Sequence, residues 1–121
     1  MRFNNAKENG YLVCKGSRRP FYNRFYQFCK AHERPFVVVQ QKVKYAEVHI
    51  DIWPTSFDFN ERGQKKLANI FRKYIPELKG GSTLAVGKTY SWISGLPISR
   101  SQAVAEEILA VWKDPRNRQE I

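Results

Sequence analysis

Two adjacent apolar patterns between residues 36 and 53 constrain the fold of this chain most strongly. Residues 36–39, Phe-Val-Val-Val, form a β-branched run of the kind that suits a well-buried strand. From Tyr45 to Trp53 polar and apolar residues alternate strictly, which is the pattern of a strand with one buried face. The apolar positions of that alternation are Ala46, Val48, Ile50 and Ile52. We therefore expect two paired strands joined by a tight turn near Lys44, with Pro54 ending the second.

Further elements flank this pair on both sides. A short strand is expected over residues 11–14, and a helix capped by Ser17 follows and ends before Pro35. The apolar face of that helix comprises Phe21, Phe25, Phe28, Cys29 and His32. A second helix is expected from about Asn60 to Ile75, with Leu67, Ile70, Phe71, Tyr74 and Ile75 on its apolar face. Residues 84–93 predict a strand, and residues 99–112 predict a last helix with core contacts at Ala103, Ile108, Leu109 and Trp112.

The expected order of elements is therefore β-α-β-β-α-β, followed by a C-terminal helix. Two helices placed symmetrically among four strands predict an α+β fold of the split βαβ, ferredoxin-like type. In such a fold an antiparallel sheet carries the first two helices on one face, with Val48, Ile50 and Ile52 directed at them. The 121 residues are expected to form a single domain with loose ends at residues 1–10 and 116–121.

Several classes of protein are disfavoured by composition. No apolar run approaches the roughly 20 residues that span a bilayer, and the first residues contain no apolar core of a signal peptide. We therefore expect a cytoplasmic protein without a membrane partner. Cys14 and Cys29 lie among bulky apolar residues, so two reduced, buried thiols are expected rather than a disulfide. No cofactor and no metal are expected.

The charge of the chain is strongly positive and unevenly distributed. Lys and Arg number 21 against 11 Asp and Glu, and the net charge is +10. Such self-repulsion is relieved by a polyanion. Lys15, Arg18 and Arg19 stand in a loop that leads into a helix N-terminus, where free N–H groups favour anions, and Arg24 follows one to two turns later. These four residues are predicted phosphate contacts.

A second basic cluster follows the expected helix at residues 60–75. Spacings of three and four place its cations on one stripe, roughly opposite the apolar face: Arg62, Lys65, Lys66, Arg72 and Lys73. No acidic residue follows Glu61 within this helix, so we expect no neutralising i,i+4 pair. The stripe therefore predicts contact with a row of duplex phosphates, together with the loop cluster.

One constellation is typical of an enzyme. Alternation places Glu47, His49 and Asp51 on one face of one strand, where they could hold a metal or share a proton. Cross-strand pairing with Lys42 or Lys44 explains the two acids equally well. Tyr22 and Tyr26 lie off the apolar helix face and are candidates for stacking on bases.

The favoured function is that of a small basic nucleic-acid-binding protein that contacts the phosphate backbone with low sequence preference. The alternative is an inhibitor or adaptor that docks the same basic surface on an acidic protein. A metal-dependent nuclease built on Glu47, His49 and Asp51 is a third and weaker hypothesis. Charge alone distinguishes neither DNA from RNA nor single from double strands, and it does not specify the oligomeric state.

Overall fold

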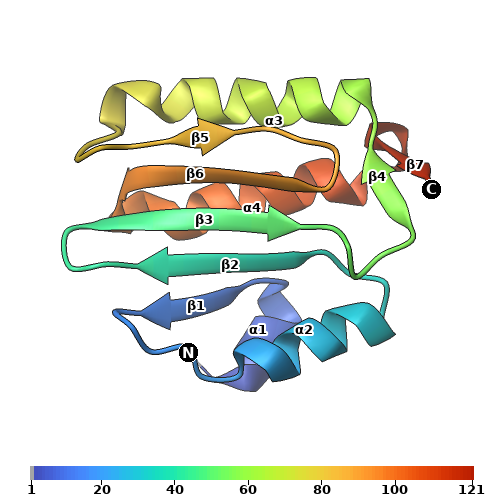
Figure 1. Ribbon diagram of the computed structural model, residues 1–121, viewed down its shortest axis with the longest axis horizontal. Helices are drawn as coiled ribbons and strands as arrows, with labels where there is room; N and C mark the ends of the chain where they lie inside the picture. The colour runs from blue at the N-terminus through green and yellow to red at the C-terminus, as the bar shows by residue number, and fades with distance from the viewer. Residues whose placement is uncertain (1) are drawn as a thin grey trace.

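The computed structural model describes residues 2–121, which form a mixed α+β fold around a five-stranded sheet (Figure 1). The helices are α1 (Phe3–Asn9), α2 (Tyr22–Ala31), α3 (Glu61–Tyr74), α4 (Ile98–Lys113) and the short 3-10 helices η1 (Ile75–Glu77) and η2 (Pro115–Asn117). The strands are β1 (Leu12–Lys15), β2 (Phe36–Gln41), β3 (Tyr45–Asp51), β4 (Phe57–Phe59), β5 (Leu84–Ala85), β6 (Tyr90–Pro97) and β7 (Arg118–Glu120). Within residues 2–121 no helix combines the length and apolar character needed to cross a membrane.

The order of strands in the sheet differs from the predicted one. The sheet runs β1-β2-β3-β6-β5, with β1 and β2 parallel and every other pair antiparallel. Helix α2 connects the two parallel strands, which are direct neighbours, so this βαβ unit is not split by a further strand. The ferredoxin-like arrangement is therefore wrong, although the expected order of the main elements along the chain is present. Strands β4 and β7 form a separate two-stranded sheet.

Strand β2 is buried on both of its faces, and this determines where the helices lie. Val37 and Val39 contribute to one hydrophobic cluster, whereas Phe36 and Val38 contribute to another. Helices α3 and α4 cover the first face, and α2 covers the second face only beside β1 and β2. The prediction that the first two helices share one face is thus wrong. A strand that is apolar on both sides needs cover on both sides.

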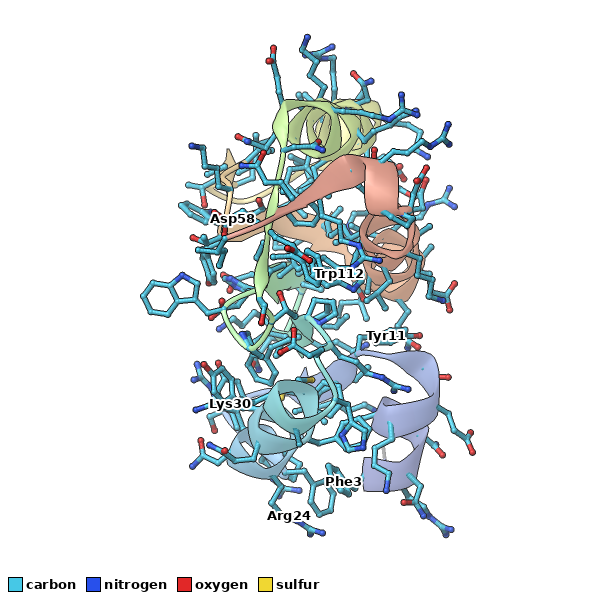
Figure 2. The ribbon with its side chains drawn as sticks, turned by 90° about the vertical axis from the view of Figure 1, so that its right-hand side faces the viewer. Phe3, Tyr11, Arg24, Lys30, Asp58 and Trp112 are labelled. Atoms are coloured by element: carbon cyan, nitrogen blue, oxygen red, sulfur yellow. The ribbon has the colours of Figure 1, made fainter. Side chains whose placement is uncertain are left out.

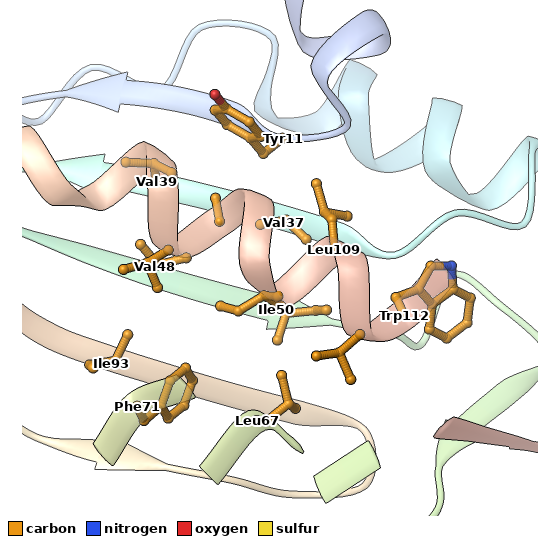
Figure 3. Close-up of a cluster of buried hydrophobic side chains, with 14 of the residues drawn as sticks. Tyr11, Val37, Val39, Val48, Ile50, Leu67, Phe71, Ile93, Leu109 and Trp112 are labelled. Carbon is orange, nitrogen blue, oxygen red and sulfur yellow. The ribbon is translucent and has the colours of Figure 1, made fainter. Parts of the chain in front are cut away.

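The larger cluster lies between the sheet and helices α3 and α4 (Figure 3). Val48 and Ile50 of β3 are fully buried in it, which confirms the predicted side-chain register of this strand. Phe71 of α3 and Ile108 of α4 pack against them. Ala103, predicted to lie in the core, is exposed instead, because the next residue, Val104, takes the buried position on α4.

The smaller cluster lies on the other face, at the β1 edge of the sheet. It contains Cys14, Phe25 and Cys29, and both cysteines are buried and free, as predicted. Residues expected to be a loose lead-in form α1 instead, which packs against β1 and α2 and buries Ala6 completely (Figure 2). This apolar contact explains why so short a helix is stable.

The C-terminal residues are also ordered, because they pair with the segment that precedes α3. Residues 118–120 form β7 against β4, where a loose end was expected. The Asn60 side chain caps α3 by accepting a hydrogen bond from the Gly63 N–H at 2.9 Å. The Asn60 N–H donates to the Asn117 carbonyl oxygen at 3.1 Å, which fixes η2 against the start of α3.

Candidate functional site

The structure separates the two basic clusters that sequence analysis assigned to one ligand. The loop cluster follows β1, which is the first strand of the sheet, whereas α3 lies beyond β5 at the opposite edge. Figures 1 and 2 both show α3 and the α1–α2 pair at opposite ends of the molecule. A short ligand therefore cannot contact both clusters at once.

The α3 cations are partly neutralised. All five are exposed, but Lys65 pairs with Glu61 at 3.3 Å and Lys73 pairs with Glu107 of α4. The first pair contradicts the expectation that no i,i+4 pair forms, because Glu61 itself stands four residues before Lys65. The Arg62 Nε donates to the Asn117 side-chain oxygen at 3.0 Å. The stripe is thus a weaker anion site than its sequence indicates.

Arg24, a predicted phosphate contact, lies against two aromatic rings. Its guanidinium lies 4.6 Å from the ring centre of Phe3 and 5.4 Å from that of Phe21. Phe21 begins α2 with a φ of 64°, a backbone conformation that bulky residues rarely adopt. Its contact with the Phe3 ring, at 5.6 Å between centroids, helps to hold that conformation. Arg24 therefore packs on this aromatic pair, apart from the loop cluster.

The loop cluster gains two lysines from the neighbouring turn. Lys15 pairs with Gln41 at the end of β2, and the turn to β3 follows directly, so five exposed cations gather at one end of the sheet. We call them the sheet-end cations: Lys15, Arg18, Arg19, Lys42 and Lys44. None of the ion pairs formed within residues 2–121 includes any of them. Over the described part of the chain, this end of the sheet is therefore a basic surface that no ion pair neutralises.

A groove of about 340 Å³ begins beside the sheet-end cations and runs along the sheet. It exists because α2 covers only the β1–β2 side of its face and leaves β3 and β6 uncovered (Figure 1). Its volume lies at the lower end of the roughly 300–1,000 Å³ that small-molecule sites occupy. The groove is lined by Arg19, Tyr22, Tyr26, Phe36, Val38, Gln40, Glu47, His49, Asp51 and Tyr90.

The wall of the groove is aromatic. Tyr22 and Tyr26 of α2 meet the Phe36 ring edge-to-face, with centroids 5.0 and 5.2 Å apart. The Arg19 guanidinium lies 5.3 Å from the centre of the Tyr22 ring, so the cation and the wall are adjacent. On the opposite side Tyr90 packs on Trp92, with centroids 5.7 Å apart. A flat, apolar ligand between two such sides would meet π-faces and a cation together.

The floor of the groove is polar, and its side chains form a chain of hydrogen bonds. His49 Nε2 lies 3.2 Å from Glu47 Oε2, and His49 Nδ1 lies 2.6 Å from Tyr90 Oη. Asp51 Oδ1 accepts a hydrogen bond from the Trp53 N–H at 2.9 Å. The sequence-predicted trio thus shares one face, and β6 adds Tyr90 to it because Asp51 and Tyr90 are cross-strand partners.

Burial and neighbouring groups keep the Tyr90 hydroxyl protonated. Burial is the largest cause that raises the pKa of Tyr90 above its usual value, and Tyr22, Asp51 and Glu47 raise it further. Opposite Glu47, β6 carries a bulge of two residues, Ser94 and Gly95, instead of one.

The structure bears on two of the three explanations of the acidic trio, and the third, a shared proton, stays a prediction. Glu47 lies opposite Gln40 rather than opposite Lys42 or Lys44, so cross-strand ion pairs do not account for the acids. Within residues 2–121 no group of three His, Cys, Asp or Glu side chains is arranged to hold a metal ion. Comparison with protein families, with curated proteins and with solved structures finds no match to this chain.

Sequence analysis found part of this site. It identified Arg19, the two tyrosines of α2 and the trio on β3, but it assigned them to separate roles. It missed Tyr90 as well as Lys42 and Lys44, because only the pairing of β3 with β6 and the closing of the β1–β2 end bring them to the groove. The sequence did carry one signal for Tyr90, because it is an aromatic residue shortly after Gly87 in an expected strand. The structure shows that its side chain is 42% exposed.

Proposed function

We propose that this protein binds nucleic acid, and that a single strand lies along the groove with its phosphates on the sheet-end cations. The observation behind this proposal is the adjacency of these cations and an aromatic groove. Proteins that hold single strands combine a positive rim for the backbone with aromatic side chains on which bases stack. Arg19 and Tyr22 bring both features within 5.3 Å of each other.

The phosphate contacts in this proposal carry little sequence information. Lysine and arginine side chains on an exposed loop neutralise phosphates of any sequence, and this contribution weakens with salt. The cations of α3 lie at the other edge of the sheet, where they would contact a separate part of a longer nucleic acid. An acidic protein would use the same cations but would leave the aromatic groove without a role.

Two double variants with equal loss of charge test this proposal. Arg18→Ala/Arg19→Ala removes two sheet-end cations, and Lys66→Ala/Arg72→Ala removes two cations of α3 that form no ion pair within residues 2–121. We expect the first variant to weaken binding of a 12-nucleotide strand and to flatten its log–log salt dependence by up to about 1.4, at about 0.7 per phosphate. The second variant should change both quantities much less. Mobility shifts between 25 and 200 mM salt measure them.

A third variant tests the aromatic part. Tyr90→Ala should weaken binding roughly 5–150-fold, the loss of one stacked base at about 1–3 kcal/mol. Equal weakening by both double variants would contradict the groove as the binding site, and no shift of any strand at low salt would refute nucleic-acid binding altogether. Displacement of the strand by polyglutamate at equal charge would favour the acidic-protein alternative.

A further inference from the structure

The hydrogen-bond chain on the groove floor has a defined direction. The Glu47 carboxylate can only accept, so in the neutral imidazole we assign the proton to His49 Nε2, which lies 3.2 Å away. His49 Nδ1 then carries a lone pair and accepts the Tyr90 hydroxyl hydrogen at 2.6 Å. The His49 Nε2 proton and the Tyr90 hydroxyl proton both take part in these hydrogen bonds, so neither is directed toward the groove.

The floor consequently offers acceptors and no donors to a ligand. Asp51 adds a carboxylate that the Trp53 N–H holds in place at 2.9 Å, and Glu47 and Tyr90 add oxygen atoms whose partner is His49. Gln40 directs its amide N–H to the Gly16 carbonyl oxygen rather than into the groove. The Glu47 and Asp51 side chains are half-buried and Tyr90 is exposed, so a ligand that covers these acceptors must supply donors, because an unmatched polar contact costs free energy. A ligand that fits this floor must carry an edge rich in N–H groups.

Among the nucleobases this requirement selects guanine. Its Watson–Crick edge presents the N1–H and the N2 amino group side by side, which together match the two oxygens of one carboxylate. Cytosine and adenine each present one amino group beside a ring nitrogen acceptor, and uracil presents a single N–H between two carbonyl groups. An acceptor on any of these edges would face an acidic oxygen of the floor.

Charge favours a nucleotide over the other kind of ligand that acceptors and aromatic rings could hold, an alkylated ammonium group. Aromatic cages with carboxylates bind such cations, but here Arg19 lines the groove and the four other sheet-end cations stand at its end. A cationic peptide would be repelled there, whereas a nucleotide has an anionic phosphate. Glu47 and Asp51 lie four residues apart on β3, which is about 13 Å at roughly 3.3 Å per residue. The groove is therefore long enough to hold a base beside Asp51 and a phosphate nearer to the sheet-end cations.

We infer that the groove recognises guanine in a single strand, with the Asp51 carboxylate on the N1–H and N2 amino edge and Arg19 toward the phosphate. This inference rests on the proposed nucleic-acid binding and adds base selectivity to it. Phe36 and Tyr90 are the cross-strand neighbours of Asp51, so the base would lie where the aromatic sides of the groove are closest to that carboxylate. His49 is a positioning residue that orients the Glu47 and Tyr90 oxygens.

The test compares uridine octamers that carry one central guanosine, adenosine or cytidine with the all-uridine octamer. One bidentate pair contributes about 1–3 kcal/mol of discrimination, so the guanosine octamer should bind roughly 5–150-fold more tightly than the others. Asp51→Asn should abolish this preference, so that in this variant the guanosine octamer binds within about threefold of the all-uridine octamer. Glu120→Gln, an exposed carboxylate of β7, is the control and should keep the preference.

Competition on the wild-type protein gives a readout that does not depend on the folding of a variant. Free GMP should displace the octamer at lower concentration than AMP, CMP or UMP. Equal binding of all four octamers would overturn the guanine inference and leave the proposed function standing, whereas no binding of any octamer would refute the proposed function. Displacement by trimethyl-lysine in preference to GMP would identify the groove as a cation cage and overturn the inference.

Discussion

Replacement of Gly63 by alanine tests how tightly the start of α3 is held against η2. In a free helix alanine is favoured over glycine by about 1 kcal/mol, so local propensity predicts a gain in stability. In this fold a Cβ at position 63 would lie 2.1 Å from the Asn117 carbonyl oxygen and 3.0 Å from Cδ1 of Phe59. The first contact is with backbone, which cannot rotate away, so α3 and η2 must separate.

The loss can be worked out from the bonds that hold this oxygen in place. It accepts from the Asn60 N–H at 3.1 Å, and the Asn117 side chain bonds Arg62 and Val111, each at 3.0 Å. Two or three such bonds at about 1 kcal/mol each, with about 1–3 kcal/mol of overpacking, exceed the gain in propensity. We expect Gly63→Ala to lower the free energy of unfolding by about 2–5 kcal/mol.

Urea titration followed by tryptophan fluorescence measures this loss, because Trp112 packs beside Phe59 at 6.0 Å between centroids. Asn69→Ala, at an exposed position of the same helix, is the control and should stay within about 0.5 kcal/mol of the wild type. A Gly63→Ala protein as stable as the wild type, or more stable, would refute the close packing of α3 on η2.

Two further predictions concern stability. Phe71→Ala should lower the free energy of unfolding by about 3–5 kcal/mol, because the ring is 1% exposed, whereas Lys65→Ala should change it by less than about 0.5 kcal/mol in the same denaturant titration. Burial, followed by a 2.5 Å hydrogen bond to Glu107, raises the pKa of Tyr74 from 10.0 to about 12. The contribution of the Tyr74 hydroxyl to stability is therefore complete below pH 10 and is lost as the pH rises toward 12. The melting temperature should fall less steeply over this pH range for Tyr74→Phe than for the wild type.

Local patterns predicted the elements better than their assembly. The alternation at residues 45–53 gave the correct buried face because one side of β3 is apolar and the other polar. The run Phe36–Val39 carried a second signal, since a strand with no polar face needs a layer on each side. A sandwich with both helices on one face was inconsistent with that run, and α2 and α3 in fact lie on opposite faces.

Short elements and cross-strand neighbours were outside the reach of sequence reasoning. Helix α1 has seven residues with weak helical preference, and its stability comes from contacts with β1 and α2. Strands β4 and β7 have three residues each and exist only because distant segments pair. The candidate site shows the same limit, because the meeting of His49 with Tyr90 depends on the register of β3 against β6.

The position of the groove between the two hydrophobic clusters has a thermodynamic consequence. Its wall, Tyr22 and Tyr26, belongs to the smaller cluster, while β3, which supplies its floor, is anchored in the larger one by Val48 and Ile50. Helix α2 packs on the smaller cluster, which has fewer buried side chains than the larger one, so we expect the wall to open more readily than the floor. A ligand that bridges wall and floor binds only when both are closed. It would therefore stabilise the closed wall by an amount that grows with the logarithm of its concentration, and the local opening of α2 would depend on occupancy.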